Sequence, residues 1–302
     1  MTELQISIVI PTYNRLDRLR YVIPSILASD LRADAYEVVV ADSRSNDGTD
    51  AYLASVAKRA PNVRHVPGDY SGRAAARNAG IAAARAPLVL FTDADIIAST
   101  DLLSRHLDRH ADGVPRAVVG LEVQVASFDD YLEQSRYPER RRRLHPPSRK
   151  RLSWLYFMTG NASVPLAQLR AVGSFDESFT GYGHEDLELG YRLQHAGLPI
   201  VYDARAVNYH WHPVPYEEQK GRMELAGRST ARFFRKHPAI GVRARLGMTP
   251  VSLGLHSLLG RNATVRSAIE RAGARPGIGR ALSYQFHYLT GVKAGLRDDG
   301  GS

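Results

Sequence analysis

The segment APLVLFTDAD, residues 86–95, joins an apolar run to two acidic side chains. Residues 87–92 (PLVLFT) have the composition of a buried strand, and Asp93 and Asp95 follow with a single alanine between them. Two like charges so close together repel each other unless a positive group lies beside them. A divalent cation with oxygen ligands is such a group, and it also binds diphosphates. The segment therefore predicts a buried strand that ends at a ligand site.

The chain on either side of this segment alternates between short apolar runs and amphipathic stretches. Strands are expected at 6–10, 36–41 and 62–66, and helices at 16–29, 49–59 and 73–86. Such alternation predicts an α/β fold with a mostly parallel central sheet and right-handed crossovers. In these sheets ligands bind beyond the carboxyl ends of the strands, which is where Asp93 and Asp95 fall.

The composition is ordinary for a soluble globular protein, and its charge favours anionic partners. Hydrophobic residues make up 44% of the 302 residues and charged residues 24%, with no cysteine for disulfides or thiolate chemistry. The net charge of +9 favours nucleotides, phosphates, acidic lipids or nucleic acid as partners. A GC-rich genome, which encodes many arginines, would give the same excess of basic residues. No signal peptide or bilayer-spanning run is evident, so we expect a cytoplasmic protein.

Two common nucleotide-binding motifs are missing. Neither GxGxxG after the first strand nor GxxxxGK[ST] occurs, which argues against a dinucleotide fold and a P-loop. Five other motifs occur in order: VIPTYNR, VVVADSRSNDGT, ARNAGIAAA, LFTDAD and GSFDESFTGYGHEDLELGYRLQHAG. Together, over about residues 5–212, they resemble the family 2 glycosyltransferases of the GT-A fold, and residues 173–197 also resemble the β-1,4-galactosyltransferases.

The resemblance implies an organisation and an activity. It implies a GT-A catalytic domain over 1–215, with a donor half at 1–98 and an acceptor half at 99–215, followed by a helical extension at 216–302. The implied reaction is sugar transfer from a nucleotide-diphospho-sugar, most simply a UDP-sugar, to an acceptor hydroxyl. One departure is visible, because the second-strand motif is a residue longer here, although Asp42 remains.

The metal site implied by the resemblance centres on the DxD motif. Asp95 is expected to ligate the metal, with Asp93 as its partner or as a further ligand, and a turn or a helix cap is the alternative role for the pair. A histidine after the last core strand completes the site in related enzymes. His210 and His212 both qualify, since alternate residues of an extended strand point the same way. Imidazole ligands favour Mn²⁺ over Mg²⁺.

The residues expected to contact the donor come from three strand ends and one helix. They are Thr12, Arg15, Asp42, Arg73, Arg77, Asn78, Asp93 and Ala94. Asp42 is placed to accept a hydrogen bond from the nucleobase of the donor. Arg73 and Arg77 share one face of a helix because they are four residues apart, and one of them can contact the diphosphate or the nucleobase. The alternative, above all for Arg73, is a basic helix face that is simply exposed to solvent.

The motif GYGHEDLELGYRL is expected to supply the chemistry. Inverting transfer needs a base for the proton of the acceptor hydroxyl. By resemblance to the galactosyltransferases, Asp186 is that base and Glu185 holds the acceptor. Both residues open a helix, so favourable interaction with the helix dipole is the alternative explanation of their charge.

Residues 136–154 form a basic segment, RYPERRRRLHPPSRKRLSW, between strands expected near 116–125 and 155–163. We predict an exposed, mobile loop that binds a diphosphate or an anionic acceptor. Nucleic acid is a weaker alternative, because few aromatic residues are available to stack on bases. The charges could also simply be exposed to solvent.

Beyond 215 we expect one helix directly, then helices at 250–260, 264–273 and 277–296. The stretch TPVSLGLHSLLG is apolar enough to pack on the catalytic domain or, with basic flanks, to touch the inner face of a membrane.

Other functions remain open at this stage. A retaining GT-A transferase that uses a GDP-sugar would share most of these motifs. A nucleotidyltransferase would need a glycine-rich loop on the first strand, which PTYNR lacks. A basic lipid- or RNA-binding protein would use the arginine-rich segment but would leave the acidic pair, the Glu-Asp pair and the histidines without a role. No nucleic-acid partner is expected, and neither the acceptor nor the oligomeric state is predicted.

Overall fold

The computed structural model describes residues 3–137 and 151–298. The chain divides into two compact units. The first unit comprises Met1–Ser178 and Glu185–Pro213, and the second comprises Phe179–His184 and Val214–Ser302. The chain therefore passes between the units three times, and the short segment before Glu185 belongs to the second one.

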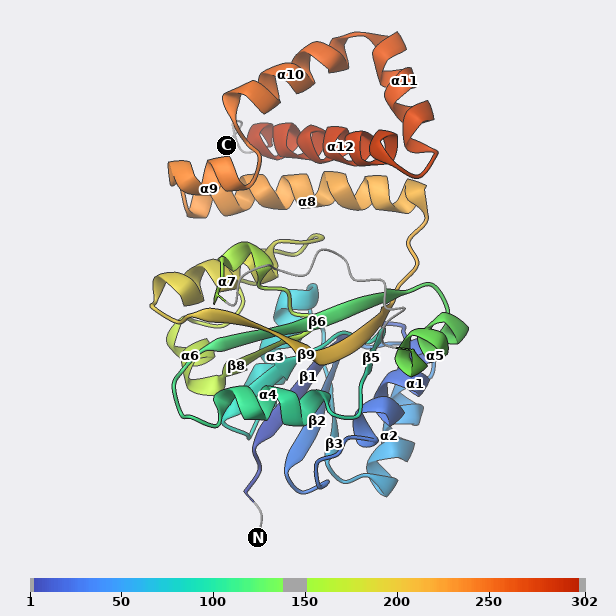
Figure 1. The fold of residues 1–302 in the computed structure, drawn as a ribbon, viewed down its shortest axis with the longest axis vertical. Helices are drawn as coiled ribbons and strands as arrows, with labels where there is room; N and C mark the ends of the chain where they lie inside the picture. Colours follow the sequence, from blue (N-terminus) through green and yellow to red (C-terminus); the bar gives the residue numbers. More distant parts are fainter. Residues whose placement is uncertain (1–2, 138–150, 299–302) are drawn as a thin grey trace. The chain divides into compact units, whose positions relative to one another are not determined.

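The first unit is built on a mixed sheet (Figure 1). Among the described residues its strands are β1 (Ile6–Thr12), β2 (Tyr36–Asp42), β3 (Val63–Pro67), β4 (Leu88–Phe91), β5 (Ile96–Ala98), β6 (Ala117–Val125), β7 (Arg151–Leu152), β8 (Ala162–Pro165) and β9 (Ile200–Trp211). The order is β3-β2-β1-β4-β8-β6-β9-β5, with β7 paired to β9. Strands β3, β2, β1 and β4 are parallel, as the alternating sequence predicts, whereas β8 is antiparallel to both of its neighbours.

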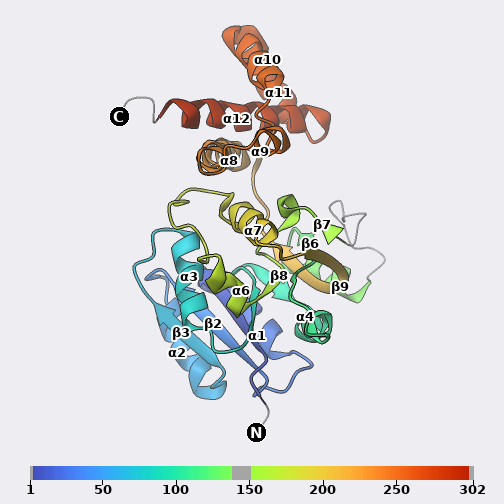
Figure 2. The same ribbon diagram turned by 90° about the vertical axis from the view of Figure 1, so that its left-hand side faces the viewer.

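Helices cover both faces of this sheet (Figure 2). The helices of the first unit are α1 (Leu16–Leu27), α2 (Thr49–Arg59), α3 (Arg73–Ala83), α4 (Leu102–His110), α5 (Phe128–Arg136), α6 (Leu166–Ala171) and α7 (Glu185–His195). One hydrophobic cluster joins α1, α2 and α4 to the even-numbered side chains of β1 and β2. Helix α3 packs on the other face, so closely that a Cβ on Gly80 would lie 2.4 Å from a methyl carbon of Val9.

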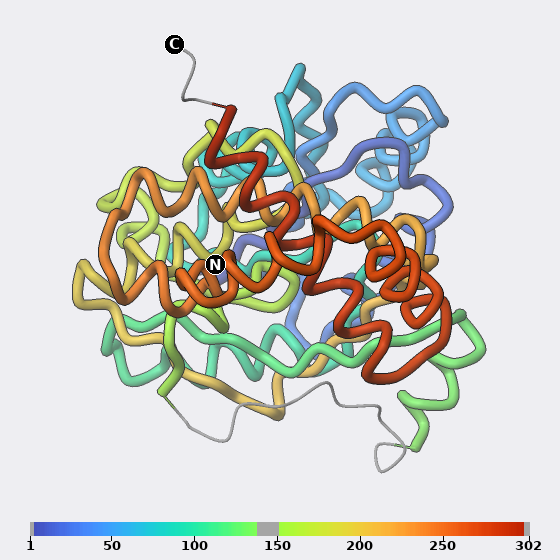
Figure 3. Tube along the Cα trace, turned by 90° about the horizontal axis from the view of Figure 1, so that it is seen from above, coloured from blue at the N-terminus to red at the C-terminus, as the bar shows by residue number. Residues whose placement is uncertain are grey.

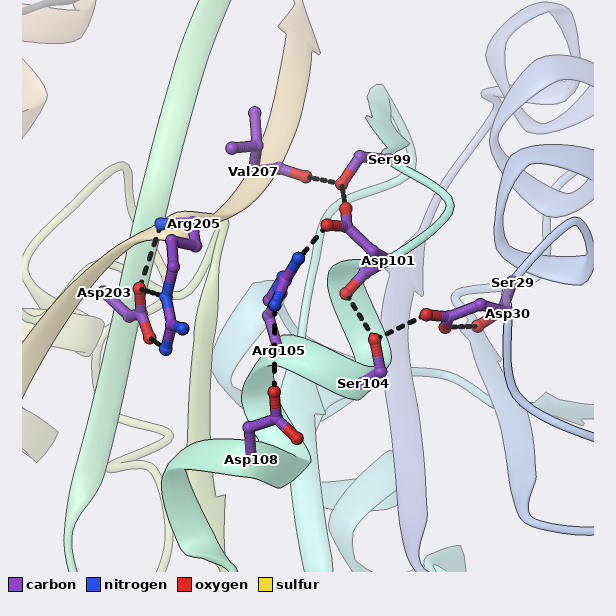
Figure 4. A network of polar contacts seen from close by, with 10 residues as sticks. All are labelled: Ser29, Asp30, Ser99, Asp101, Ser104, Arg105, Asp108, Asp203, Arg205 and Val207. Atoms are coloured by element: carbon purple, nitrogen blue, oxygen red, sulfur yellow. Dashed lines mark hydrogen bonds and ion pairs between the residues drawn. The ribbon is translucent and has the colours of Figure 1, made fainter.

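Strand β9 is irregular at a point that matters for the site. Gly120 of β6 pairs with Asp203 and the next residue, Leu121, pairs with Val207, so three residues of β9 have no partner in the register. Arg205 folds back onto the Asp203 carboxylate, and Ser99 donates to the Val207 carbonyl at 2.7 Å (Figure 4). These contacts fasten the start of α4 to β9 just before β9 reaches its histidines.

The second unit is helical. It contains α8 (Tyr216–Lys236), α9 (Ile240–Arg245), α10 (Pro250–Arg261), α11 (Ala263–Gly273) and α12 (Ile278–Arg297). Helix α12 lies along α8, and α10 and α11 pack against the other side of α12 (Figures 1 and 3). Gly227 and Gly291 allow the close contact of α8 and α12, since a Cβ at either would fall within about 2 Å of backbone atoms. No helix of the described residues is long and apolar enough to cross a membrane.

The prediction of a strand near 155–163 is wrong for most of this range. A 3₁₀ helix occupies Trp154–Tyr156, and β8 begins only at Ala162. Trp154 and Phe157 are buried while Tyr156 and Met158 are exposed, a period of three rather than two. Helices α5, α6 and α9 and strands β5 and β7 were not expected, whereas α4 begins where the helix-cap alternative for Asp93 and Asp95 would place a helix. Most of the basic segment, residues 138–150, lies outside the described residues.

Candidate active site

The parallel strands bring predicted donor residues to one edge of the sheet. Thr12 and Asp42 are partners in the register of β1 and β2, at the last residue of each strand. Both side chains are buried, and the Thr12 hydroxyl has no hydrogen-bond partner among the described residues. Asp42 accepts from the hydroxyl of Ser45 at 2.5 Å and lies 3.3 Å from Nε2 of His65. A carboxylate so fixed suits the recognition of an N–H group.

Asp95 meets both candidate histidines. Its carboxylate lies 3.5 Å from Nε2 of His210 and 2.9 Å from Nδ1 of His212. One ligand atom from each of these residues lies within 4.8 Å of the others. The histidines share one face of β9 because they are two residues apart, and a backbone hydrogen bond from Trp211 to the Asp95 carbonyl fixes the register. One carboxylate and two imidazoles make a donor set that could hold a divalent metal ion, and the imidazoles favour Mn²⁺ over Mg²⁺.

The charges of this cluster support one another. Burial opposes ionisation of Asp95, but hydrogen bonds with the two histidines outweigh it and hold the pKa of the Asp95 carboxyl far below its usual range. Burial also disfavours the imidazolium of His210, yet hydrogen bonds with Asp95 and Glu122 raise the pKa of His210 to about 11. Bound metal would take the place of this proton, because only a neutral imidazole nitrogen can ligate.

Arg77 links Asp93 of the acidic pair to the first residue of helix α7. Its guanidinium donates to Asp93 at 2.8 Å and to Glu185 at 2.9 Å, although the two carboxylates are far apart in sequence. The Arg77 side chain is 2% exposed. Burial opposes its charge, but Asp93, Glu185 and Asp186 outweigh this and raise the pKa of the guanidinium above its ordinary value. The sequence predicts that Arg77 contacts the donor. The structure shows, in addition, that Arg77 joins Asp93 to Glu185.

Glu185 and Asp186 open helix α7 and are both buried. Burial, reinforced by repulsion from Glu185, raises the pKa of Asp186 well above that of a solvated aspartate. A carboxylate with a raised pKa is a better proton acceptor near neutral pH than an ordinary one. One oxygen of Glu185, Oε2, is buried with no partner among the described residues and is therefore available to a ligand.

The remaining predicted donor residues lie on several different elements. Asn78 uses its amide on the backbone of Phe175 and on Glu177, so it tethers the chain that leads toward α7. Arg15 precedes the first residue of α1, Arg73 is the first residue of α3, and Ala94 is buried between the two acids. Their contacts with a donor stay predictions.

Sequence reasoning overlooked two polar residues of β6. Glu122 and Gln124 lie on the same face of the sheet as His210, and Glu122 contacts the His210 ring directly. The signal was present in LEVQV, residues 121–125, where buried apolar side chains alternate with polar ones. In a central strand, the polar positions of such an alternation mark a face that is turned to a site.

Comparison with known proteins identifies the family of this chain. Residues 7–170, more than half of the chain, match the model of glycosyl transferase family 2. The chain belongs to glycosyl transferase family 2. This family 2 chain also matches, over residues 140–209, a family model described as the N-terminal domain of galactosyltransferase. The resemblances to both groups are thereby confirmed.

Relatives of this family 2 chain include curated enzymes. It is 31% identical over 263 residues to validoxylamine A glucosyltransferase of Streptomyces hygroscopicus subsp. jinggangensis (strain 5008), covering 78% of this chain and 61% of the relative. It is 27% identical over 257 residues to an uncharacterized glycosyltransferase, YfnE, of Bacillus subtilis (strain 168), covering 68% and 64%. The chain thus spans less than two thirds of the length of these relatives.

Solved structures show the GT-A fold. The mannosyltransferase PcManGT from Pyrobaculum calidifontis, in complex with GDP-Man and Mn²⁺, aligns with a TM-score of 0.68 at 20% identity, covering 99% of this chain and 88% of that one. S. aureus TarS 1–349 in complex with UDP-GlcNAc aligns with a TM-score of 0.58 at 16% identity, covering 96% and 91%. The predicted fold class is confirmed.

Proposed function

We propose that the protein is a metal-dependent, inverting glycosyltransferase that moves a sugar from a nucleotide-diphospho-sugar to an acceptor hydroxyl. The observation that carries this proposal is the link that Arg77 makes between two groups of acidic residues. Arg77 donates to Glu185, the neighbour of Asp186 at the start of α7, and to Asp93, which lies two residues before Asp95 and its histidine contacts. One buried cation thus lies beside both the proposed base and the proposed metal ligands, which suits single-displacement transfer.

In the proposed reaction Asp186 takes the proton of the acceptor hydroxyl. The acceptor oxygen forms a bond to the anomeric carbon while the bond from that carbon to the diphosphate oxygen breaks, and the electron pair leaves with the diphosphate. Asp95, His210 and His212 would hold a divalent ion whose charge offsets that of the leaving group. Glu185 orients the acceptor through its unpartnered oxygen. Attack from the face opposite the leaving group inverts the anomeric configuration.

We propose a UDP-sugar as the donor. Asp42, held by Ser45 at the end of β2, is placed to accept from the N–H of uracil. The similar solved structures are named with UDP-GlcNAc and with GDP-Man, so a test of the nucleobase has to include both UDP-sugars and GDP-sugars. The Mn²⁺ named with GDP-Man supports the choice of metal.

A thermal-shift panel of UDP-, GDP-, CDP- and dTDP-sugars, with and without Mn²⁺, tests donor and metal together. We expect the unfolding temperature to rise only with a UDP-sugar and Mn²⁺, because a ligand of the native state stabilises by mass action. Asp95→Ala is the matched variant and should abolish the Mn²⁺-dependent shift. A shift with GDP-sugars alone would refute the uracil assignment, and a product of retained configuration would refute the inverting mechanism.

We also propose that the second unit docks on an anionic membrane surface. Val251, Leu255 and Leu258 form an exposed apolar stripe on α10 at i, i+4 and i+7 spacing. Residues 240–282 contain seven arginines and one acidic residue, Glu270, which is paired with Lys220 and His287. Apolar side chains beside surplus positive charge suit the interface of an anionic bilayer.

A further inference from the structure

Glu122 touches the proposed metal site without belonging to the cluster of Asp95 and the two histidines. It lies on β6, where its register partner on the parallel strand β9 is Asn208, two residues before His210. Its Oε1 is 2.9 Å from Nδ1 of His210 and also accepts from the Gln124 amide at 2.7 Å. The imidazole of His210 therefore lies between two carboxylates, Glu122 at Nδ1 and Asp95 at Nε2.

The structure leaves room for this carboxylate and holds it in place. A Cβ on Gly160, in the turn before β8, would lie 2.3 Å from Oε2 of Glu122. A larger residue here would displace the carboxylate from its present position. The turn is itself fixed to β9, because Asn208 donates to the Gly160 carbonyl at 2.7 Å. Glu122 thus occupies a defined site that neighbouring strands build around it.

The two histidines are not equivalent in this arrangement. His212 contacts Asp95 through Nδ1, and within the described residues Asp95 is its only acidic partner. His210 has a second acid behind it. A carboxylate that accepts from one ring nitrogen fixes the tautomer, leaves the other nitrogen for a metal and strengthens it as a ligand.

We propose that Glu122 is a positioning residue that directs Nε2 of His210 to the metal, which makes His210 the principal imidazole ligand. This inference rests on the metal dependence in the proposed function. Glu122 acts through His210 and does not itself bind the metal. The loss caused by removing Glu122 should therefore depend on the presence of His210.

The test is Mn²⁺ affinity, measured from the free Mn²⁺ signal in electron paramagnetic resonance, first with Mn²⁺ alone and then with UDP. We expect Glu122→Ala to weaken Mn²⁺ binding about 10–100-fold, the usual effect of losing such a partner. Glu122→Gln keeps the shape and a neutral acceptor, so its loss should be smaller. Asp112→Asn, which removes a negative charge elsewhere on the first unit, is the charge control and should bind as the wild type does.

A double-mutant cycle separates positioning from other roles. In a His210→Ala background, Glu122→Ala should cause no further loss, whereas in a His212→Ala background its full effect should remain. An effect that persists without His210 would overturn the proposal, since Glu122 would then act by its charge or as a ligand. Wild-type affinity in both Glu122 variants would overturn it as well. Failure of the wild type to bind Mn²⁺ in either condition would instead refute the proposed metal dependence, and this inference with it.

Discussion

Replacing Arg77 with methionine should destabilise the first unit strongly. Methionine fills much of the arginine volume but leaves both carboxylate partners without their cation. Asp93 is 25% exposed and can be rehydrated, whereas Glu185 is 5% exposed and cannot. The cost is therefore that of one stranded buried charge, about 3–5 kcal/mol of unfolding free energy.

Urea unfolding followed by tryptophan fluorescence measures this cost selectively. The only two tryptophans of the chain, Trp154 and Trp211, both belong to the first unit. The double variant Arg77→Met/Glu185→Gln should recover most of the loss, because the stranded charge is gone. Arg32→Met is the matched control, since both side chains of its ion pair with Asp34 are exposed and its loss should leave the unfolding free energy nearly unchanged. A loss below about 1 kcal/mol for Arg77→Met, or no recovery in the double variant, would contradict the buried-bridge reasoning.

Three further predictions concern catalysis, acid stability and membrane binding. Asp186→Asn should lower the transfer rate by roughly 10²–10⁴-fold with donor binding retained; near-normal transfer would exclude Asp186 as the base. Burial lowers the pKa of His106 from 6.5 to about 4, so the unfolded state takes up the proton first as the pH falls. The contribution of His106 to the unfolding free energy should then fall by about 3 kcal/mol between pH 7 and pH 4, and His106→Gln should remove this contribution in urea titrations at each pH. The protein should sediment with vesicles that contain phosphatidylserine and not with phosphatidylcholine alone, and Leu255→Ser/Leu258→Ser should lower the bound fraction; equal binding to both lipids would refute the electrostatic part.

The parallel half of the sheet was predictable because its strands are short β-branched runs separated by amphipathic helices. Asp95 and the histidines were predictable because a motif and a period of two both depend only on local sequence. The Arg77 bridge was not, since spacing reveals that Arg73 and Arg77 share a helix face but not that Glu185 reaches one of them. Glu122 was missed for a related reason, because its partner lies on a neighbouring strand. The false strand near 155–163 came from aromatic composition, which a buried 3₁₀ turn shares.

The segment Phe179–His184 has a consequence for dissecting this protein into parts. The hydroxyl of Thr230 on α8 lies 2.9 Å from His184, and Ser229 donates to the Tyr182 carbonyl, so the segment packs with the C-terminal helices. Gly183 and His184 both have positive φ, a conformation that His184 adopts at a cost. Deleting everything after Pro213 would remove the partners of this segment, whose next residue, Glu185, begins helix α7. A truncated protein should therefore retain its sheet and the proposed metal ligands, while the proposed base, Asp186, loses a fixed position. We expect the smallest active fragment to include α8.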